Sequence, residues 1–358
     1  MSILVKTNIT VTGYDLLTSL DKIIANADIN PGSFLILIDK TISDLYKDKI
    51  LKSLSRLDKP LTLSIIEAGE RQKDILKIPN IIKPFFAQAF DRKSCLVSIG
   101  GGVVSDIGGF LSSIMLRGIS SIFMPTTLLA QIDAAIGGKN GVDLFIENGN
   151  MLKNMLGTFK QPDLVICDVK FLKTLPEHEI ISGLGEMAKY YLGWGTPSKE
   201  ELMGFRDLIK SNNWKGAGNI IHHCQKIKTA ITLSDPFEQS GIRQKLNLGH
   251  TIGHAVEAVA NGELSHGQAV GIGLIAAAKI SLLKGLLPEN KFAEIRNTIL
   301  QLGLPVSVSN INKNAVLNAL KFDKKDGTFI LIKDIGKIIA QIDVEQHIIK
   351  QALDEIII

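Results

Sequence analysis

Five short apolar runs in the first half of the chain, separated by helix-like stretches, restrict the possible folds more than any other feature. The runs are SFLILID (33–39), LTLSIIEAG (61–69), SCLVSIGGG (94–102), SIFMPTT (121–127) and PDLVICD (162–168). Short runs with little polar alternation are typical of strands that are buried on both faces. Their alternation with helices predicts an α/β fold with an open, mainly parallel sheet, in which ligands bind at the carboxyl ends of the strands.

After about residue 170 the apolar residues follow the spacing of long helices, as in EIISGLGEMAKYYLGW, GHTIGHAVEAVA and HGQAVGIGLIAAAKISLL. A late segment, TFILIKDIGKIIAQID, favours a strand pair. A length of 358 residues is typical of about two domains. We therefore predict an α/β nucleotide-binding domain over 1–168 and an all-α domain, apart from that pair, over 169–358.

Composition excludes several classes of function. The net charge is only +4 and the lysines are spread along the chain, so we expect no nucleic-acid partner. The cysteines, Cys95, Cys167 and Cys224, form no paired framework, which fits a reducing cytoplasm. The N-terminus lacks a signal-peptide pattern, and the most apolar later stretch is interrupted by Lys279. We expect a cytoplasmic protein, no membrane partner, and a buried helix at that stretch.

Two glycine-rich segments are candidate anion-binding sites. SIGGGVVSDIGGF (98–110) follows a strand and opens a helix, where backbone amides can approach a phosphate, although its spacing is not GxGxxG. Asp39, at the end of an earlier strand, is either a ribose ligand or a helix N-cap. AAIGGKNGVD (134–143) is not a P-loop, but Lys139 is a flexible cation after two glycines, and Lys153 with Asn154 offers a second such pair.

LNLGHTIGHAVEA carries two histidines, His250 and His254, four residues apart and therefore on one face of a helix. A third histidine, His266, follows a short Asn-Gly break. Each alone is explained as a core or cap residue, but the three together also suggest metal binding or catalysis. In SGLGEMAKYYL, Glu186 and Lys189 lie on a helix that reads as buried, where a carboxylate needs a cation. Glu186 is thus the natural oxygen ligand to join two histidines in a catalytic zinc site.

These residues lie in blocks that resemble the 3-dehydroquinate synthases and their relatives, the sugar phosphate cyclases. The blocks are GGGVVSDIGGF, RGISSIFMPTTLLAQIDAAIGGK, FLKTLPEHEIISGLGEMAKY and LNLGHTIGHAVEA with SHGQAV. They occur in order over most of the chain, from Asp39 to the DKK near residue 323.

The resemblance implies a role for each matching residue. The metal ligands for Zn²⁺ or Co²⁺ would be Glu186, His250 and His266, whereas His254 would assist proton transfer. Further catalytic residues would be Lys139, Lys189, Arg243 and Glu238, with Gln239 as an alternative match to Glu238. Substrate would be bound by Arg117, Asp133, Asn154, Lys228, Asn247 and Lys324. NAD would be bound by Asp39, Glu70, Lys73, Gly101, Gly102, Asp106, Thr126, Thr127, Lys153, Thr174, Leu175 and Glu179.

The reaction that the resemblance implies converts 3-deoxy-D-arabino-heptulosonate 7-phosphate, a small anionic sugar phosphate, into 3-dehydroquinate and phosphate in the shikimate pathway. It proceeds by transient oxidation with NAD, phosphate elimination and aldol closure, so the enzyme is a lyase. Arg117 would reach the substrate of a neighbouring subunit, which implies a homodimer. The alternatives are another sugar phosphate cyclase, of the 2-deoxy-scyllo-inosose or epi-valiolone synthase type, a metal-dependent NAD(P) alcohol or glycerol-1-phosphate dehydrogenase, and a non-catalytic scaffold.

The sequence departs from the family pattern at two places that bear on the cofactor. Ser105 stands where a glycine is usual, and we expect it to require a permissive backbone angle. The segment between Lys139 and Lys153 is several residues longer than usual, and we treat 140–152 as a lengthened loop.

Overall fold

The apolar runs of the first half form a seven-stranded sheet in the computed structural model, which describes residues 3–5, 9–88, 90–145, 151–323 and 328–358. The strands in sheet order are β1 (Ile3–Val5), β2 (Ile9–Gly13), β9 (Leu164–Asp168), β6 (Ser120–Pro125), β5 (Cys95–Gly100), β3 (Phe34–Asp39) and β4 (Leu61–Ile66). Only the β1–β2 pair is antiparallel among these, so the prediction of a mainly parallel sheet is confirmed.

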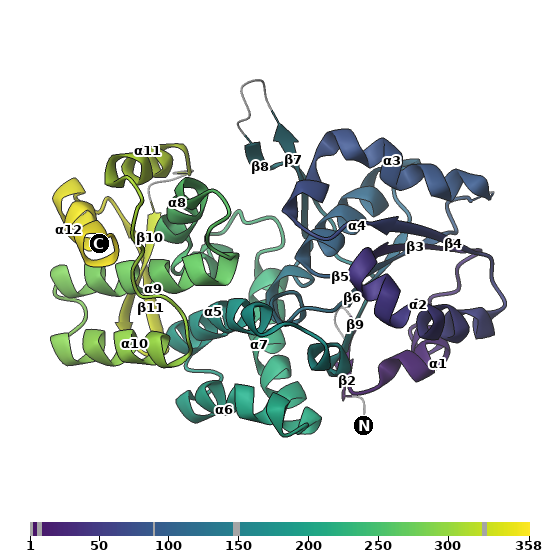
Figure 1. Ribbon diagram of the computed structural model, residues 1–358, viewed down its shortest axis with the longest axis horizontal. Helices are drawn as coiled ribbons and strands as arrows, with labels where there is room; N and C mark the ends of the chain where they lie inside the picture. Colours follow the sequence, from purple (N-terminus) through teal and green to yellow (C-terminus); the bar gives the residue numbers. More distant parts are fainter. Residues whose placement is uncertain (1–2, 6–8, 89, 146–150, 324–327) are drawn as a thin grey trace. The chain divides into compact units, whose positions relative to one another are not determined.

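Helices cover both faces of this sheet (Figure 1). They are α1 (Leu20–Ala25), α2 (Lys40–Leu54), α3 (Ile78–Ile82) and α4 (Gly102–Ile114). Ile36 and Ile38 of β3 pack with α1 and α2, whereas Leu35 and Leu37 pack with α3 and α4. Alternate side chains of β3 thus enter two apolar cores, which explains why the run is apolar at every position.

A two-stranded antiparallel hairpin, β7 (Lys139–Phe145) and β8 (Met151–Phe159), follows in the segment that we expected to be a loop. The expectation was wrong for its described part: only 146–150, between the two strands, lie outside the described residues. Polar side chains and glycines interrupt both strands, so neither shows the apolar alternation by which a strand is predicted.

The chain divides into two compact units, Met1–Leu175 with Asn212–Asn219 and Pro176–Ser211 with Ile220–Ile358. The predicted division after residue 168 into two functional domains stays a prediction. The second unit is mostly helical. Its elements are α5 (Glu177–Trp194), α6 (Lys199–Lys210), most of α7 (Trp214–Ser234), α8 (His250–Ala260), α9 (His266–Leu283), α10 (Glu289–Gln301), α11 (Lys313–Asp323), α12 (Gln346–Ile356) and the hairpin β10 (Thr328–Asp334) and β11 (Lys337–Ile342).

Helix α9 is the centre of the second unit and contacts α5, α8, α10, α12 and β10 (Figure 1). It is long and apolar enough to cross a membrane by length and composition alone, but 72% of it is buried inside the protein. A helix that is apolar on all sides is buried in this way when other helices surround it. The expectation of a buried helix at this stretch is therefore confirmed.

Candidate metal centre and cofactor-binding residues

Helix α5 carries a buried ion pair. The side chains of Glu186 and Lys189 are 1% and 2% exposed, and the Glu186 Oε2 atom lies 2.5 Å from Lys189 Nζ. Almost every residue from Ile180 to Gly193 is buried, so the helix has no water-facing side along this stretch. Two charges cost solvation energy in such a place and remain only where other charged or polar groups stabilise them.

The two candidate histidine ligands each begin a helix. His250 is the first residue of α8, after Gly249, which adopts a left-handed φ of 79°. His266 is the first residue of α9, after Ser265, whose side chain accepts a hydrogen bond from the Gln268 amide in a capping box. The left-handed glycine before α8 and the capping box before α9 mark where the two helices start and therefore where both imidazoles lie.

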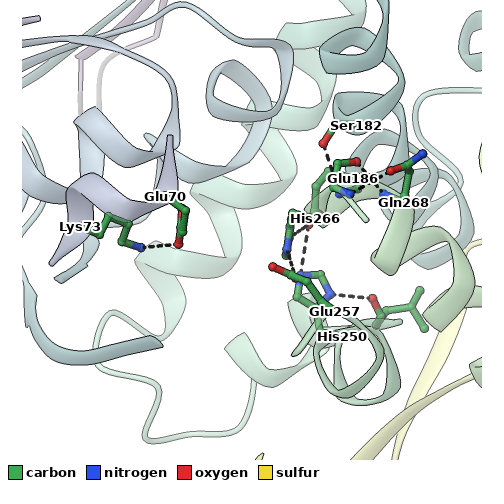
Figure 2. A network of polar contacts seen from close by, with 11 residues as sticks. Glu70, Lys73, Ser182, Glu186, His250, Glu257, His266 and Gln268 are labelled. Atoms are coloured by element: carbon green, nitrogen blue, oxygen red, sulfur yellow. Dashed lines mark hydrogen bonds and ion pairs between the residues drawn. The ribbon is translucent and has the colours of Figure 1, made fainter. Parts of the chain in front are cut away.

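Both imidazoles converge on one carboxylate oxygen, as Figure 2 shows. Nε2 of His250 lies 3.2 Å from Glu186 Oε1, and Nε2 of His266 lies 3.0 Å from the same atom. His254 has a ring nitrogen within 4.8 Å of those of His250 and His266, but its side chain is more exposed than theirs. The structure thus brings Glu186 and all three histidines together.

The spacing of these donor atoms fits a metal ion. Four-coordinate zinc, with bonds of about 2.0–2.2 Å, separates neighbouring donor atoms by roughly 3.3–3.5 Å. The two distances to Glu186 Oε1, 3.0 and 3.2 Å, are slightly shorter, so small side-chain shifts suffice to admit the ion. Two imidazoles and one carboxylate are also a ligand set of catalytic zinc sites, which keep a position for substrate.

The pKa values of Glu186 and of the two histidines beside it are shifted in different directions. Burial raises the pKa of Glu186, but Lys189 and then His250 outweigh it and hold it well below the usual 4.5. Burial lowers the pKa of His250 to about 4. Burial also lowers the pKa of His266, but hydrogen bonds to Glu186 and Glu257 reverse this and raise it to about 10. Glu186 is therefore ionised, as a carboxylate must be to bind a metal.

Other predicted residues of the second unit lie on the chain just before α8. Arg243 is 2% exposed; its backbone amide donates to Asp235 Oδ2 at 3.1 Å, and its Nη1 donates to the Pro236 carbonyl at 3.0 Å. Glu238 lies in the same turn, with a left-handed φ of 57°. Asn247 ends the short helix that Arg243 begins.

The remaining predicted residues of this unit are more scattered. Lys228 is buried on α7, 8% exposed. Glu179 lies in the first turn of α5. Lys324 lies outside the described residues.

In the first unit, three adjacent strands end at the same edge of the sheet. Asp39 ends β3, Gly101 follows β5 and Thr126 follows β6. A Cβ at Gly100 would lie 2.8 Å from Asp39 Oδ2, and one at Gly101 would lie 3.1 Å from Thr127 Cγ2. Gly101 also precedes α4 without a side-chain cap, so the first amides of α4 are suited to an anion such as a pyrophosphate.

The structure shows the local contacts of Asp39 and Ser105, two residues whose backbone roles the sequence left open. Asp39 is an N-cap: its Oδ1 accepts from the Ile42 amide at 2.9 Å, while Oδ2 faces Gly100. Burial raises the pKa of Asp39. Ser105 lies inside α4 with no left-handed angle, and its hydroxyl donates to the Gly101 carbonyl at 3.3 Å. The expectation that Ser105 requires a permissive angle was wrong, because the position is helical.

Lys73 is the centre of a second charged cluster in this unit. It is 3% exposed, and its Nζ donates to Asp106 Oδ2 at 2.8 Å and to Asn154 Oδ1 at 2.5 Å. Glu70 Oε1 lies 3.6 Å from the same Nζ, and Figure 2 shows this ion pair. Burial lowers the pKa of Lys73, but Asp106 and Glu70 outweigh it and raise it. The structure thus joins four predicted residues, and Lys73 stays a cation.

Asp143 is a member of this cluster that the sequence analysis missed. Its side chain is fully buried, and Oδ1 accepts from the Asn154 backbone amide at 2.7 Å, holding Asn154 at a left-handed φ of 51°. Its charge also raises the pKa of Lys73. Predicting a hairpin for this segment would have placed Asp143 of β7 across from the part of β8 that contains Asn154. Because we expected a loop, the contact between the two residues was not predicted.

The other predicted residues of the first unit have separate positions. Asp133 lies in a π-helical turn, Ala130–Ala134, and Lys139 and Lys153 are exposed at the start of β7 and on β8. The Thr174 hydroxyl lies 2.9 Å from the Tyr46 hydroxyl. Gly102 begins α4, Leu175 is half-buried, and Arg117 is exposed after α4 with a φ of 67°.

Comparisons with known proteins agree over most of the chain. The family models described as 3-dehydroquinate synthase N-terminal and C-terminal match residues 63–182 and 183–326. A 3-dehydroquinate synthase from Thermodesulfovibrio yellowstonii is 38% identical over 326 residues, 89% of each chain. One from Alkaliphilus metalliredigens is 36% identical over 338 residues, 91% of this chain and 90% of the relative.

A solved structure is also similar over nearly the full length. It is the 2-epi-5-epi-valiolone synthase of Streptomyces hygroscopicus subsp. jinggangensis 5008 with NAD⁺ and Zn²⁺ bound. It is 27% identical, with a TM-score of 0.87, covering 99% of this chain and 97% of its own.

Proposed function

Because the chain belongs to the 3-dehydroquinate synthase family, we propose that it converts 3-deoxy-D-arabino-heptulosonate 7-phosphate into 3-dehydroquinate and phosphate. The observation that carries this proposal is the convergence of His250 and His266 on Glu186. A metal beside a substrate hydroxyl would lower the pKa of that hydroxyl, and the carboxylate and two imidazoles are a donor set that fits such a metal. The product belongs to the shikimate pathway of aromatic amino acid biosynthesis.

Glu186, His250 and His266 would hold Zn²⁺ or Co²⁺, which acts as a Lewis acid that lowers the pKa of a substrate hydroxyl. Lys189 holds Glu186 by the buried ion pair, so the carboxylate keeps one orientation. His254 stands beside the two ligands and would take up the hydroxyl proton on a ring nitrogen.

Residues of the first unit would hold NAD, which would supply reversible hydride transfer. Gly101 and Gly102 would place the pyrophosphate at the start of α4, and Asp39 Oδ2 would accept from a ribose hydroxyl. The other cofactor residues that we propose are Glu70, Lys73, Asp106, Thr126, Thr127, Lys153, Thr174, Leu175 and Glu179.

Cations and amides would hold the anionic substrate so that each step occurs in one orientation. Arg243 and Lys228 are buried cations, which lose less binding energy to water than exposed ones. Lys139, Glu238, Asp133, Asn154, Asn247 and Lys324 complete the set. Arg117 would contact substrate in the neighbouring subunit of a homodimer, and the buried cysteines are compatible with a cytoplasmic location.

The deciding experiment supplies the heptulosonate phosphate with catalytic NAD and zinc, and follows phosphate release together with NADH absorbance. We expect phosphate and dehydroquinate without net NADH. Conversion of all the added NAD into NADH without phosphate release would contradict the proposal and indicate a dehydrogenase. The absence of both phosphate release and NADH formation would contradict the substrate assignment.

A second candidate is 2-epi-5-epi-valiolone synthase, which the similarity to that enzyme's structure favours. A rival sugar phosphate cyclase would act on a hexose or heptulose phosphate, so the same phosphate assay run with such substrates separates the two activities. We expect the heptulosonate phosphate to be preferred, because the 3-dehydroquinate synthases are more similar in sequence.

A further inference from the structure

Glu257 is a carboxylate beside the metal site to which neither the sequence nor the family resemblance gave a role. It lies on α8, seven residues after His250, so the two residues are on the same face of that helix. Its Oε2 atom lies 3.0 Å from Nδ1 of His266, the first residue of α9. Figure 2 shows Glu257 on the far side of His266 from Glu186. One imidazole is therefore held between two carboxylates.

An imidazole that binds a metal through Nε2 must carry its proton on Nδ1. His266 presents Nε2 to Glu186 and Nδ1 to Glu257. His250 presents Nε2 to the same oxygen, and its Nδ1 lies 3.0 Å from the Leu248 carbonyl. Each ligand thus has an acceptor that selects the tautomer with a free Nε2. The acceptor is a backbone carbonyl for His250 and a side-chain carboxylate for His266.

We propose that Glu257 is a positioning residue that fixes the ring and tautomer of His266 for metal binding. The inference rests on the metal site proposed above. A carboxylate that accepts the Nδ1 proton also increases the basicity of Nε2, so it strengthens the metal bond as well as orienting it.

The location of Glu257 supports a role beyond stabilising its own helix. Its side chain is 15% exposed and that of His266 is 33% exposed, so the hydrogen bond is partly shielded from water. The bond joins α8 to the start of α9, and thereby links the helices that supply the two histidine ligands. His266 needs this support more than His250, because its ring is the more exposed of the two.

The test compares Glu257→Ala and Glu257→Gln with the intact protein and with Glu263→Gln. Glu263 is a matched control, since it is an exposed glutamate in the turn after α8. Zinc affinity is measured by competition with a chromogenic chelator, and the ligand geometry by the visible spectrum of the Co²⁺-loaded protein. Neither measurement depends on activity. Circular dichroism of each protein without metal reports folding.

We expect Glu257→Ala to weaken zinc binding by about 10–100-fold and to alter the cobalt spectrum. Glu257→Gln keeps an acceptor oxygen without the charge, so its loss is smaller, and Glu263→Gln binds as the intact protein does. Should Glu257→Ala not fold, Glu257→Gln decides, because it preserves the side-chain volume.

Unchanged zinc affinity in a folded Glu257→Ala would overturn the inference and leave the metal site standing. If the intact protein bound no zinc, the role of Glu257 and the metal site would both be overturned. This outcome is distinguished from the first because it is seen without any variant. An equal loss in Glu263→Gln would also overturn it, since the effect would then reflect general charge near the site.

Discussion

The ion pair between Glu186 and Lys189 is difficult to explain by a contribution to folding stability. A buried ion pair loses its solvation, and well-packed apolar residues of similar volume are commonly as stable. Both side chains are nearly inaccessible, at 1% and 2% exposed, on a helix whose other buried positions are mostly small or apolar. A metal ion beside Glu186 would give the carboxylate a function, and Lys189, which pairs with Oε2, would then keep Oε1 turned towards the histidines.

His250 tests this assignment directly. We expect His250→Ala to lose stoichiometric zinc and to reduce turnover by more than about 100-fold, because removing a ligand costs more than removing its hydrogen-bond partner. Metal content after dialysis and phosphate release are the measurements. His347→Ala, an exposed histidine on α12, is the control and keeps both. Full zinc content in His250→Ala would place the metal elsewhere.

Asp235 predicts a pH dependence of stability. Its carboxylate accepts from the backbone amides of Gln239, Ser240 and Arg243. Burial raises the pKa of Asp235, but these amides lower it to about 2, from 3.8 in an unfolded chain. The group therefore adds stability that is complete above 3.8 and is lost as the pH falls towards 2.

We accordingly expect Asp235→Asn to lower the melting temperature near neutral pH, with a difference from the intact protein that shrinks as the pH falls below 3.8. Differential scanning calorimetry across this range measures it. A difference that stays constant with pH would show that the charge of Asp235 is unimportant.

At the scale of the elements, two glycines allow α5 and α9 to approach closely enough for Glu186 to contact His266. A Cβ at Gly185 would lie under 3.0 Å from the Gly267 carbonyl oxygen, and one at Gly267 under 3.0 Å from the Ser182 carbonyl oxygen. The backbones of α5 and α9 therefore touch at the residues next to the two candidate ligands. Any side chain there must push the helices apart.

We expect Gly267→Ala to lower the free energy of unfolding by about 1–3 kcal/mol, because a methyl group overfills this contact. It should also weaken zinc binding, since Glu186 and His266 separate. Gly204→Ala is the matched control: nothing lies within 4 Å of its Cβ on α6, so it should gain about 1 kcal/mol from helix propensity. Urea unfolding compares them. Equal stability of Gly267→Ala and the intact protein would refute the close contact.

The sequence predicted elements well where burial imposes a simple pattern. The run SFLILID predicted β3 because both faces of that strand are covered, and the buried neighbours of Glu186 predicted its need for a cation. Neither β7 nor β8 was predicted, because polar residues such as Asp143 enter that hairpin to contact Asn154. The meeting of Glu186 with His266 depends on the contact at Gly185 and Gly267, which is a packing event between distant segments and leaves no local signal.

At the scale of the whole molecule, the proposed chemistry is divided between the two units. Most of the candidate cofactor residues lie in the first unit, with Glu179 in the second, while α5, α8 and α9 of the second unit carry the candidate metal ligands. Neither unit alone contains a complete set. We therefore expect catalysis to require the intact chain, and the proposed role of Arg117 in a neighbouring subunit would extend the same requirement to a dimer.

Arg117 is the residue with which a requirement for the second subunit can be tested. It is exposed, at a left-handed φ of 67°, just after α4. We expect Arg117→Ala to raise KM for the phosphate substrate and to keep zinc content and dimer mass, measured by steady-state kinetics, metal analysis and sedimentation. Loss of one charge-assisted contact corresponds to roughly a 10–100-fold effect on kcat/KM.

Mixing two defective proteins separates action within a subunit from action on its neighbour. In a heterodimer of Arg117→Ala with His250→Ala, one site combines an intact metal centre with an arginine from the other chain. Random exchange makes about half of the dimers mixed, each with one complete site, so activity should recover to roughly a quarter of normal under conditions where both parents are nearly inactive. If Arg117 served its own subunit, no site in the mixture would be complete. Activity would then stay at the average of the two parents, and the shared site would be excluded.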